Sequence, residues 1–228
     1  MFRVPDQVGI GNIFIFLSQI DDTFPVSNKL LDGFRGKYLN FKNLNIVEDD
    51  PNIQTYCPPI YINPYTYNTI HPMCRNKVEP SDELRKIIDQ NIHLVDGVTA
   101  GLAIRFGNTR KTEGEVVPFI DDHGIKQFEA IIESSDGPVF LACDKLEYKH
   151  ELKKRYGEKI RYVESDCVHT HSMNVIDSPD PYLEFFLLAM CPIVYITGGP
   201  RDFHAFSTFG YMASVWGQTQ HHTIWNLI

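Results

Sequence analysis

The sequence predicts an α/β fold in which a parallel sheet is covered by helices on both faces. From about residue 80 onward, short apolar runs typical of buried strands alternate with amphipathic runs of helical periodicity. The strand-like runs contain few polar residues, and strands that are apolar on both faces are typical of a parallel sheet between two helical layers. This part of the chain is therefore expected to be Rossmann-like.

Each predicted helix carries apolar side chains along one face. A helix is expected to open at Ser81, because Leu84, Ile87, Ile88 and Ile92 recur at helical spacing after it. Further helices are predicted over 124–134, 148–156, 181–190 and 206–216. Strands are predicted over 98–106, 138–143, 160–163, 192–197 and 223–227.

The first part of the chain is less regular. An apolar helix is expected after the turn Gly9-Ile10-Gly11-Asn12, but the segment 51–80 is rich in Pro, Tyr and Asn and reads as a link between two halves. We therefore predict two domains, a small one over 1–78 and a larger one over 79–228.

Composition excludes several classes of protein. The chain has 228 residues, 43% of them hydrophobic and 22% charged, which is typical of a folded globular protein. Lys and Arg number 21 against 29 Asp and Glu, so the net charge is −8 and the molecule as a whole repels nucleic acid and anionic lipid. An anionic ligand must then be held by a local cluster of donors.

Cysteine usage and hydropathy bear on the cellular compartment. The five cysteines form no C-x-x-C pair, which fits neither a disulfide framework nor a zinc ribbon, so a reducing compartment is expected. The apolar stretch 8–20 lacks the basic flank and cleavage site of a signal peptide and is too short to span a bilayer. We expect a soluble cytoplasmic protein without a membrane anchor.

The glycine turn near the start allows two interpretations. Gly9, Gly11 and Asn12 precede a helix N-terminus, a geometry in which a ligand can approach the backbone closely. A plain tight turn is the alternative. An NAD site is disfavoured, because the third glycine and the acidic residue about 20 positions later that a dinucleotide fingerprint requires are missing.

Three predicted strand ends carry candidate binding residues, and ligands of open parallel sheets bind beyond the carboxyl ends of the strands. Arg105 ends a buried strand, where its guanidinium suits a diphosphate or, alternatively, a carboxylate of a neighbouring helix. Asp144 ends the next strand and could accept hydrogen bonds from a base or ribose, or cap the following helix. Ser207, Thr208 and Phe209 open a helix whose N-terminus favours phosphate, although Ser207 could be an ordinary cap.

A bound metal is not expected. No Asp-x-Asp motif occurs, and adjacent carboxylate pairs such as Asp121-Asp122 point to opposite faces of a strand. His169 with His171, and His221 with His222, lack a third ligand at usable spacing. Nor does any cysteine lie in a recognisable nucleophile setting.

The helix predicted over 148–156 carries four cations, Lys149, Lys153, Lys154 and Arg155. Acidic residues are interleaved with them, namely Glu147, Glu151 and Glu158. This mixture of charges favours a solvated helix face.

The motifs at the strand ends resemble those of a known family. Ile104-Arg105-Phe106-Gly107-Asn108 is similar to the arginine motif of the GDP-fucose-dependent α1,6-fucosyltransferases, which include the rhizobial nodulation fucosyltransferases. The strand, Asp and charged helix over 139–156 and the helix, strand and Ser/Thr/Phe loop over 184–209 look like the next elements of that family, and the Gly-Asn turn is similar to its early turn. The resemblance covers about 130 residues well.

The resemblance implies a GT-B fold of two Rossmann-like lobes, the acceptor-side one small and the C-terminal one binding the nucleotide sugar. By position, Arg105 would clamp the diphosphate, with Asn108 in the same motif, and Asp144 would hold the guanosine. Ser207, Thr208 and Phe209 would contact the phosphates. An acid lies eight residues after the motif arginine in such enzymes, and Glu113 falls there.

Together with these residues, the resemblance implies an inverting, metal-independent glycosyltransferase that uses a GDP-sugar, with fucose favoured by the resemblance, and a glycan acceptor. No cofactor is expected. Glu113 or Glu115 could serve as base, and Arg105 and the helix at Ser207 would stabilise the departing phosphates. The family has His, a second Arg and Asp where this chain has Ala103, Phe106 and Asn108, so a degenerate glycosyltransferase fold that binds a nucleotide or glycan without turnover is the alternative.

Overall fold

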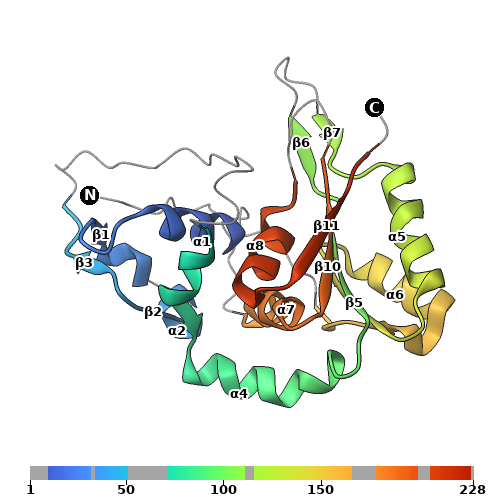
Figure 1. Cartoon of the computed structure of the whole chain (residues 1–228), viewed down its shortest axis with the longest axis horizontal. Coiled ribbons are helices and arrows are strands. Elements are labelled where there is room, and N and C mark those ends of the chain that lie inside the picture. The colour runs from blue at the N-terminus through green and yellow to red at the C-terminus, as the bar shows by residue number, and fades with distance from the viewer. Residues whose placement is uncertain are drawn as a thin grey trace.

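The computed structural model describes residues 10–31, 34–50, 71–110, 116–165, 178–199 and 206–226. Its centre is a five-stranded sheet in the order β11-β10-β5-β8-β9, in which all four neighbouring pairs are parallel (Figure 1). The strands are β5 (Ala100–Ile104), β8 (Val139–Cys143), β9 (Ile160–Arg161), β10 (Ile193–Thr197) and β11 (Gln220–Ile224). The parallel sheet predicted from the apolar runs is confirmed.

Helices cover both faces of this sheet. They are α4 (Asp82–Asn91), α5 (Asp122–Ser134), α6 (Leu146–Tyr156), α7 (Asp180–Ala189) and α8 (Thr208–Gly217). Along β5 the side chains alternate: Leu102 and Ile104 pack with α5 and α6, whereas Ala103 packs with α7 and α8. Each large apolar side chain buried in these two layers stabilises the fold by roughly 1.5–3 kcal/mol. The mixed α/β architecture with helices on both sheet faces is confirmed.

Most element boundaries agree with the predictions to within a few residues. Ser81 caps α4 by accepting a hydrogen bond from the N–H of Leu84 (3.2 Å), as its position before the apolar pattern predicts. β11 begins at Gln220, three residues before the predicted start at 223. The prediction missed these residues because β11 is an edge strand, in which the polar side chains of His221 and His222 are exposed. Apolar content alone does not detect such a strand.

The N-terminal part forms smaller elements beside the main sheet. β1 pairs with β3 in parallel and β2 pairs with β4 in an antiparallel manner. The elements are α1 (Ile10–Gln19), β1 (Pro25–Ser27), η1 (Asn28–Leu31), α2 (Phe34–Tyr38), β2 (Leu39–Phe41), β3 (Asn45–Val47), η2 (His71–Asn76) and β4 (Val78–Pro80).

Part of the segment predicted as a link is packed structure instead. Residues 51–70 lie outside the described residues, but Cys74 and Val78 are fully buried. The indole N–H of Trp216 on α8 also donates to the carbonyl of Val78 (2.9 Å). The link prediction is therefore wrong for 71–80, whose apolar residues fill the space beside α8.

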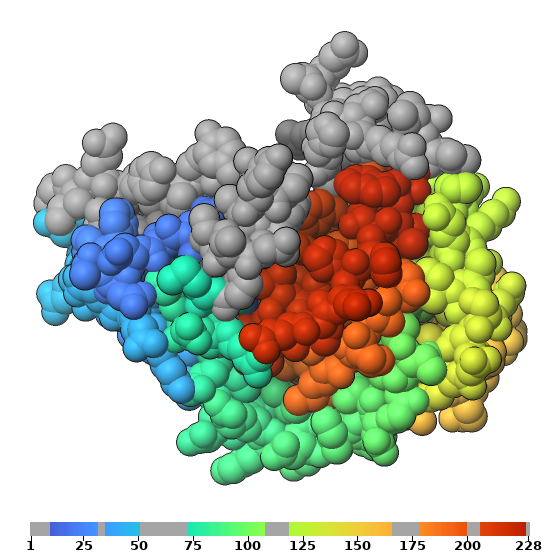
Figure 2. Space-filling model, viewed as in Figure 1, coloured from blue at the N-terminus to red at the C-terminus, as the bar shows by residue number. Residues whose placement is uncertain are grey.

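Helix α1 shares its hydrophobic core with α7 and α8. The rings of Phe14 and Phe185 lie 4.6 Å apart between centroids, and both side chains are fully buried. Figure 1 shows α1 beside α8, and Figure 2 shows the teal residues that follow residue 70 against the red C-terminal ones. The division at residue 78 and the two-lobe arrangement stay predictions.

No helix in the described part of the chain combines the length and the apolar character that a membrane crossing requires.

Replacing Gly11 on α1 tests the contact between α1 and α8. A Cβ at Gly11 would lie 2.4 Å from the carbonyl carbon of Thr208 and 2.6 Å from the N of Phe209, so Gly11→Ala must push the two helices apart. We expect a loss of about 1–3 kcal/mol in the free energy of unfolding, measured by urea denaturation. Ser134→Ala, at an exposed position of α5, is the control and should change it by less than about 0.5 kcal/mol.

Candidate active site at the carboxyl edge of the sheet

Thr197, the last residue of β10, holds two neighbouring elements together. Its buried hydroxyl donates to the carbonyl of Ala103 (3.0 Å) and accepts from the N–H of Arg105 (3.1 Å). Its carbonyl accepts from the N–H of Ser207 (2.8 Å). Arg105, after β5, and Ser207, before α8, therefore lie at the same carboxyl edge of the sheet, beside one strand end.

The side chain of Arg105 is half-buried and has spare hydrogen-bonding capacity. Its guanidinium carbon lies 5.3 Å from the ring centroid of Phe119, and its Nε is buried without a hydrogen-bond partner. Burial lowers the pKa of Arg105, and the negative charge of Asp144 partly opposes this effect. Because an unpaired buried donor is costly, a ligand that accepts from this guanidinium would be favoured.

Among the described residues no side chain caps the N-terminus of α8. Ser207 occupies the N-cap position, but its side chain makes no capping hydrogen bond. The ordinary-cap alternative therefore does not describe this serine. The N–H groups of the first turn, which begins at Thr208, lack a side-chain cap, and such groups favour an anion. Phe209 instead packs its ring against Phe185, with the centroids 5.5 Å apart.

The predicted glycine turn is wrong, because α1 already begins at Ile10 and Gly11 lies inside the helix. Gly11 provides room for the backbone of Thr208 and Phe209 on α8, so on that side it faces the helix and not a ligand. Next to it, the Oδ1 atom of Asn12 is buried without a hydrogen-bond partner in the described structure. Gly9 lies outside the described residues.

Asp144 is held by the loop that follows β5. Its two carboxylate oxygens accept from the N–H groups of Phe106 (2.8 Å) and Gly107 (3.0 Å). It does not cap the next helix, since the N-cap position of α6 is Lys145. These bonds shape the backbone beside Arg105, and the role of Asp144 toward guanosine stays a prediction.

The residues predicted after the arginine motif are only partly described. Asn108 begins β6 (Asn108–Arg110), which pairs with β7 (Val116–Pro118) in an antiparallel hairpin. Glu113 and Glu115 lie outside the described residues, and so do His169 and His171.

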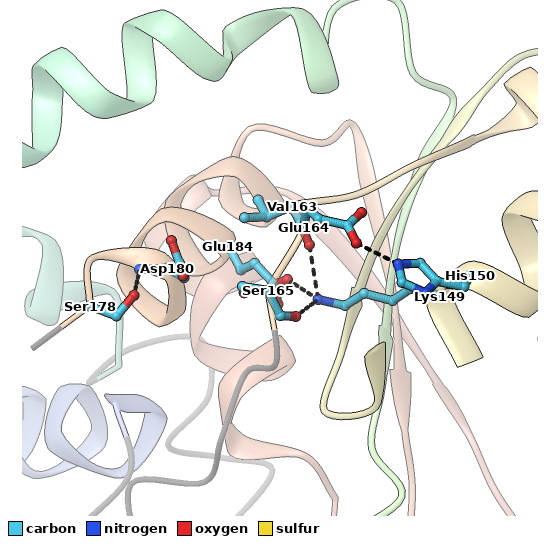
Figure 3. Close-up of polar contacts among 8 residues, drawn as sticks. All are labelled: Lys149, His150, Val163, Glu164, Ser165, Ser178, Asp180 and Glu184. Carbon is cyan, nitrogen blue, oxygen red and sulfur yellow. Dashed lines mark hydrogen bonds and ion pairs between the residues drawn. The ribbon is translucent and has the colours of Figure 1, made fainter. Parts of the chain in front are cut away.

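A buried ion pair that the sequence reasoning missed lies between α6 and α7 (Figure 3). Lys149 is fully buried, Glu184 is 1% exposed, and Nζ lies 2.5 Å from Oε1. Nζ also donates to the carbonyls of Ser165 (2.8 Å) and Val163 (3.2 Å), in the segment after β9. The pair therefore joins two helices and a loop.

The prediction that Lys149 belongs to a solvated face is wrong. Lys153 and Arg155 do pair with Glu158 and Glu129 on the exposed side of α6, but Lys149 lies one turn before the buried Leu152. The available signal was a charge on the apolar face of α6 together with Glu184 inside the apolar run of α7. Two opposite charges in apolar settings indicate a buried pair.

The ionisable groups beneath the strand end do not favour nucleophilic catalysis. Burial raises the pKa of Cys143, the last residue of β8, to about 12, so its thiol is neutral at pH 7.

In the described part of the chain no three His, Cys, Asp or Glu side chains gather in a way that could hold a metal ion. The chemistry that these residues offer is binding of an anion by Arg105 and the N-terminus of α8.

The sequence matches no protein-family model and no curated protein. Among solved structures the chain is similar to the NodZ α-1,6-fucosyltransferase co-crystallised with GDP, with 14% identity and a TM-score of 0.41. It is also similar to the fucosyltransferase NodZ from Bradyrhizobium, with 12% identity and a TM-score of 0.36. Each alignment covers 64% of this chain and 46% of the other, so the chain spans less than half of the length of these proteins.

Removing one partner of the buried ion pair should destabilise the protein strongly. Lys149→Met leaves the carboxylate of Glu184 buried without its cation, for which we expect a loss of about 3–5 kcal/mol in the free energy of unfolding. The double variant Lys149→Met/Glu184→Leu should recover most of this loss, because no charge then stays buried. Lys153→Met is the control, since its partner Glu158 is exposed. Urea denaturation measures the free energy of unfolding of all three variants. A double variant that is no more stable than Lys149→Met would contradict the explanation that the loss comes from an unpaired buried charge.

Proposed function

We propose that this protein is an inverting, metal-independent glycosyltransferase that transfers a sugar, fucose being favoured, from a GDP-sugar to a glycan acceptor. The observation that carries the proposal is the position of Thr197, whose hydrogen bonds bring Arg105 and the N-terminus of α8 to one edge of the sheet. A cation and uncapped helix N–H groups at one site suit a pyrophosphate. The choice of a GDP-sugar and of fucose comes from the resemblance of the 104–108 motif.

In this proposal the protein supplies charge stabilisation to the leaving group. A base takes the proton of the acceptor hydroxyl, the oxygen attacks the anomeric carbon, and the bond from that carbon to the phosphate oxygen breaks. Negative charge then grows on the departing GDP, where Arg105 and the first turn of α8 stabilise it without a metal. Glu113 is the proposed base.

A binding protein without turnover is the second candidate, and the packing around Ala103 favours it. Ala103 is 3% exposed, and its Cβ would lie 2.5 Å from a Cβ built on Gly210 of α8. The fucosyltransferase family that the 104–108 motif resembles often has a histidine at this position, and a side chain of that size would collide with α8. Phe106, in place of the second arginine, packs against Tyr148 with the ring centroids 4.8 Å apart.

Calorimetry with GDP, UDP and ADP tests donor binding. We expect a preference for GDP that is lost in Arg105→Ala, at a cost on the order of 2–5 kcal/mol in binding free energy. Arg85→Ala, which removes a cation paired with Glu79 outside this site, is the control and should bind GDP like the wild type. Equal binding of all three nucleotides by the wild type would remove the basis of the GDP-sugar assignment.

Substituting Thr197 tests the geometry of the site. Thr197→Val removes the hydroxyl that positions Arg105, so we expect GDP affinity to fall on the order of tenfold. Thr197→Ser keeps the hydroxyl and should restore most of the affinity. Calorimetry measures the GDP affinity of both variants, on samples that circular dichroism shows to be folded. If the valine and serine variants bind GDP alike, the hydroxyl does not position the site.

Transfer of radiolabelled fucose from GDP-fucose to a mixture of glycans separates the two candidates. An enzyme should give transfer or donor hydrolysis that falls at least about 100-fold in Glu113→Gln, as expected when a general base is lost. Binding of GDP-fucose without transfer or hydrolysis would instead support the non-catalytic candidate.

A further inference from the structure

A polar pocket lies near the C-terminal end of α1. The other end of this ten-residue helix packs against α8, so about 15 Å of helix separates the pocket from the site described above. The pocket has a volume of about 360 Å³, which lies in the range of small-molecule sites. Its lining includes Asp22, Lys42, Asn43, Arg75, Asn76 and Lys77, and we call it the α1 pocket.

Cations outnumber carboxylates in the lining of the α1 pocket. Lys42, Arg75 and Lys77 line it together with one carboxylate, Asp22. Two carboxylates outside the lining also act on these cations, because Glu79 pairs with Lys42 and the charge of Asp21 acts on Lys77. The positive charge that is left for an anionic ligand is therefore chiefly that of Arg75.

Lys77 is a buried cation in the wall of the α1 pocket. The residue is only 1% exposed, and its Nζ donates to the carbonyl of Ile20 (2.5 Å) and pairs with Asp22 (2.9 Å). An ammonium group has three donors, so one stays available beyond these two partners. The side chain of Asp22 is 63% exposed.

The guanidinium of Arg75 lies over an aromatic ring and pairs with no carboxylate of the described residues. Its guanidinium carbon lies 5.3 Å from the ring of Trp216, which is itself fixed by the hydrogen bond to Val78. In the described structure no acidic side chain pairs with Arg75. A stacked guanidinium keeps the N–H donors in its plane free for a bidentate anion. Lys42, by contrast, already pairs with Glu79.

The turn at Lys42 and Asn43 is polar and is hydrogen-bonded to the segment 76–77. Asn43 has a left-handed backbone with φ of 50°, and its side-chain N–H donates to the carbonyl of Asn76 (3.0 Å). The N–H of Lys42 also donates to the carbonyl of Lys77 (2.8 Å). The side-chain amide of Asn76 and the Oδ1 atom of Asn43 keep hydrogen-bonding capacity suited to hydroxyl groups.

We propose that the α1 pocket binds a small polar ligand through one oxyanion group, a carboxylate or a phosphate. The guanidinium of Arg75 and the remaining donor of Lys77 bind the oxyanion, and the asparagine side chains contact hydroxyls of the same ligand. This site is separate from the one at the carboxyl edge of the sheet, and the inference does not rest on the proposed function.

The probes are glucuronate, glucose 6-phosphate, inorganic phosphate and neutral glucose, titrated calorimetrically into the full chain at low salt. We expect the anionic sugars to bind and glucose to give no measurable binding. Arg75→Gln should weaken binding of the anionic sugars about tenfold or more, and Arg75→Lys should weaken it less. Lys86→Gln, which removes an exposed cation on α4, is the charge-matched control and should bind like the wild type.

Arg105→Ala distinguishes this pocket from the sheet edge. Binding of the anionic sugars that survives Arg105→Ala but not Arg75→Gln supports the α1 pocket, whether or not GDP binds elsewhere. Equal affinity for inorganic phosphate would identify the free anion, and not a sugar, as the ligand. Binding that is lost in Arg105→Ala, equal effects of Arg75→Gln and Lys86→Gln, or no binding of any anion would overturn the proposal.

Discussion

The buried hydroxyl of Thr197 is the interaction on which the geometry of the candidate site depends. It donates to one residue of the neighbouring strand end and accepts from another, and its own carbonyl fixes the residue before α8. Each of these groups would be unpaired in the interior without its partner, which makes the arrangement costly to change. A strand end and a helix N-terminus are thereby held in one relative position.

Close packing of α8 limits the chemistry at this edge. Gly11 and Gly210 let the backbones of α1 and α8 approach their neighbours, and a side chain larger than Ala103 would have no room beneath α8. In our proposal, anion binding there falls to Arg105 and the helix N-terminus. Asp144, which looks available in the sequence, is already bonded to two backbone N–H groups.

Buried charges serve two different arrangements in this protein. Lys149 and Glu184 satisfy each other between α6 and α7, and the carbonyls of Val163 and Ser165 take the remaining donors of the lysine. Lys77 instead lies at the wall of a cavity and has one donor beyond its two partners. In the first arrangement all three donors of the lysine are used, whereas the second lies where we propose that a ligand binds.

The sequence by itself determined the parallel sheet and the five helices after residue 80, because apolar periodicity reports directly which faces are buried. It did not predict the antiparallel pair β6 and β7. It also placed Arg105, Asp144 and Ser207 at strand or helix ends. Only the tertiary structure decided that Asp144 is bonded to the loop after β5, that Gly11 faces α8 and that Lys149 is buried. Those facts depend on contacts between residues far apart in the chain, and local patterns carry no record of such contacts.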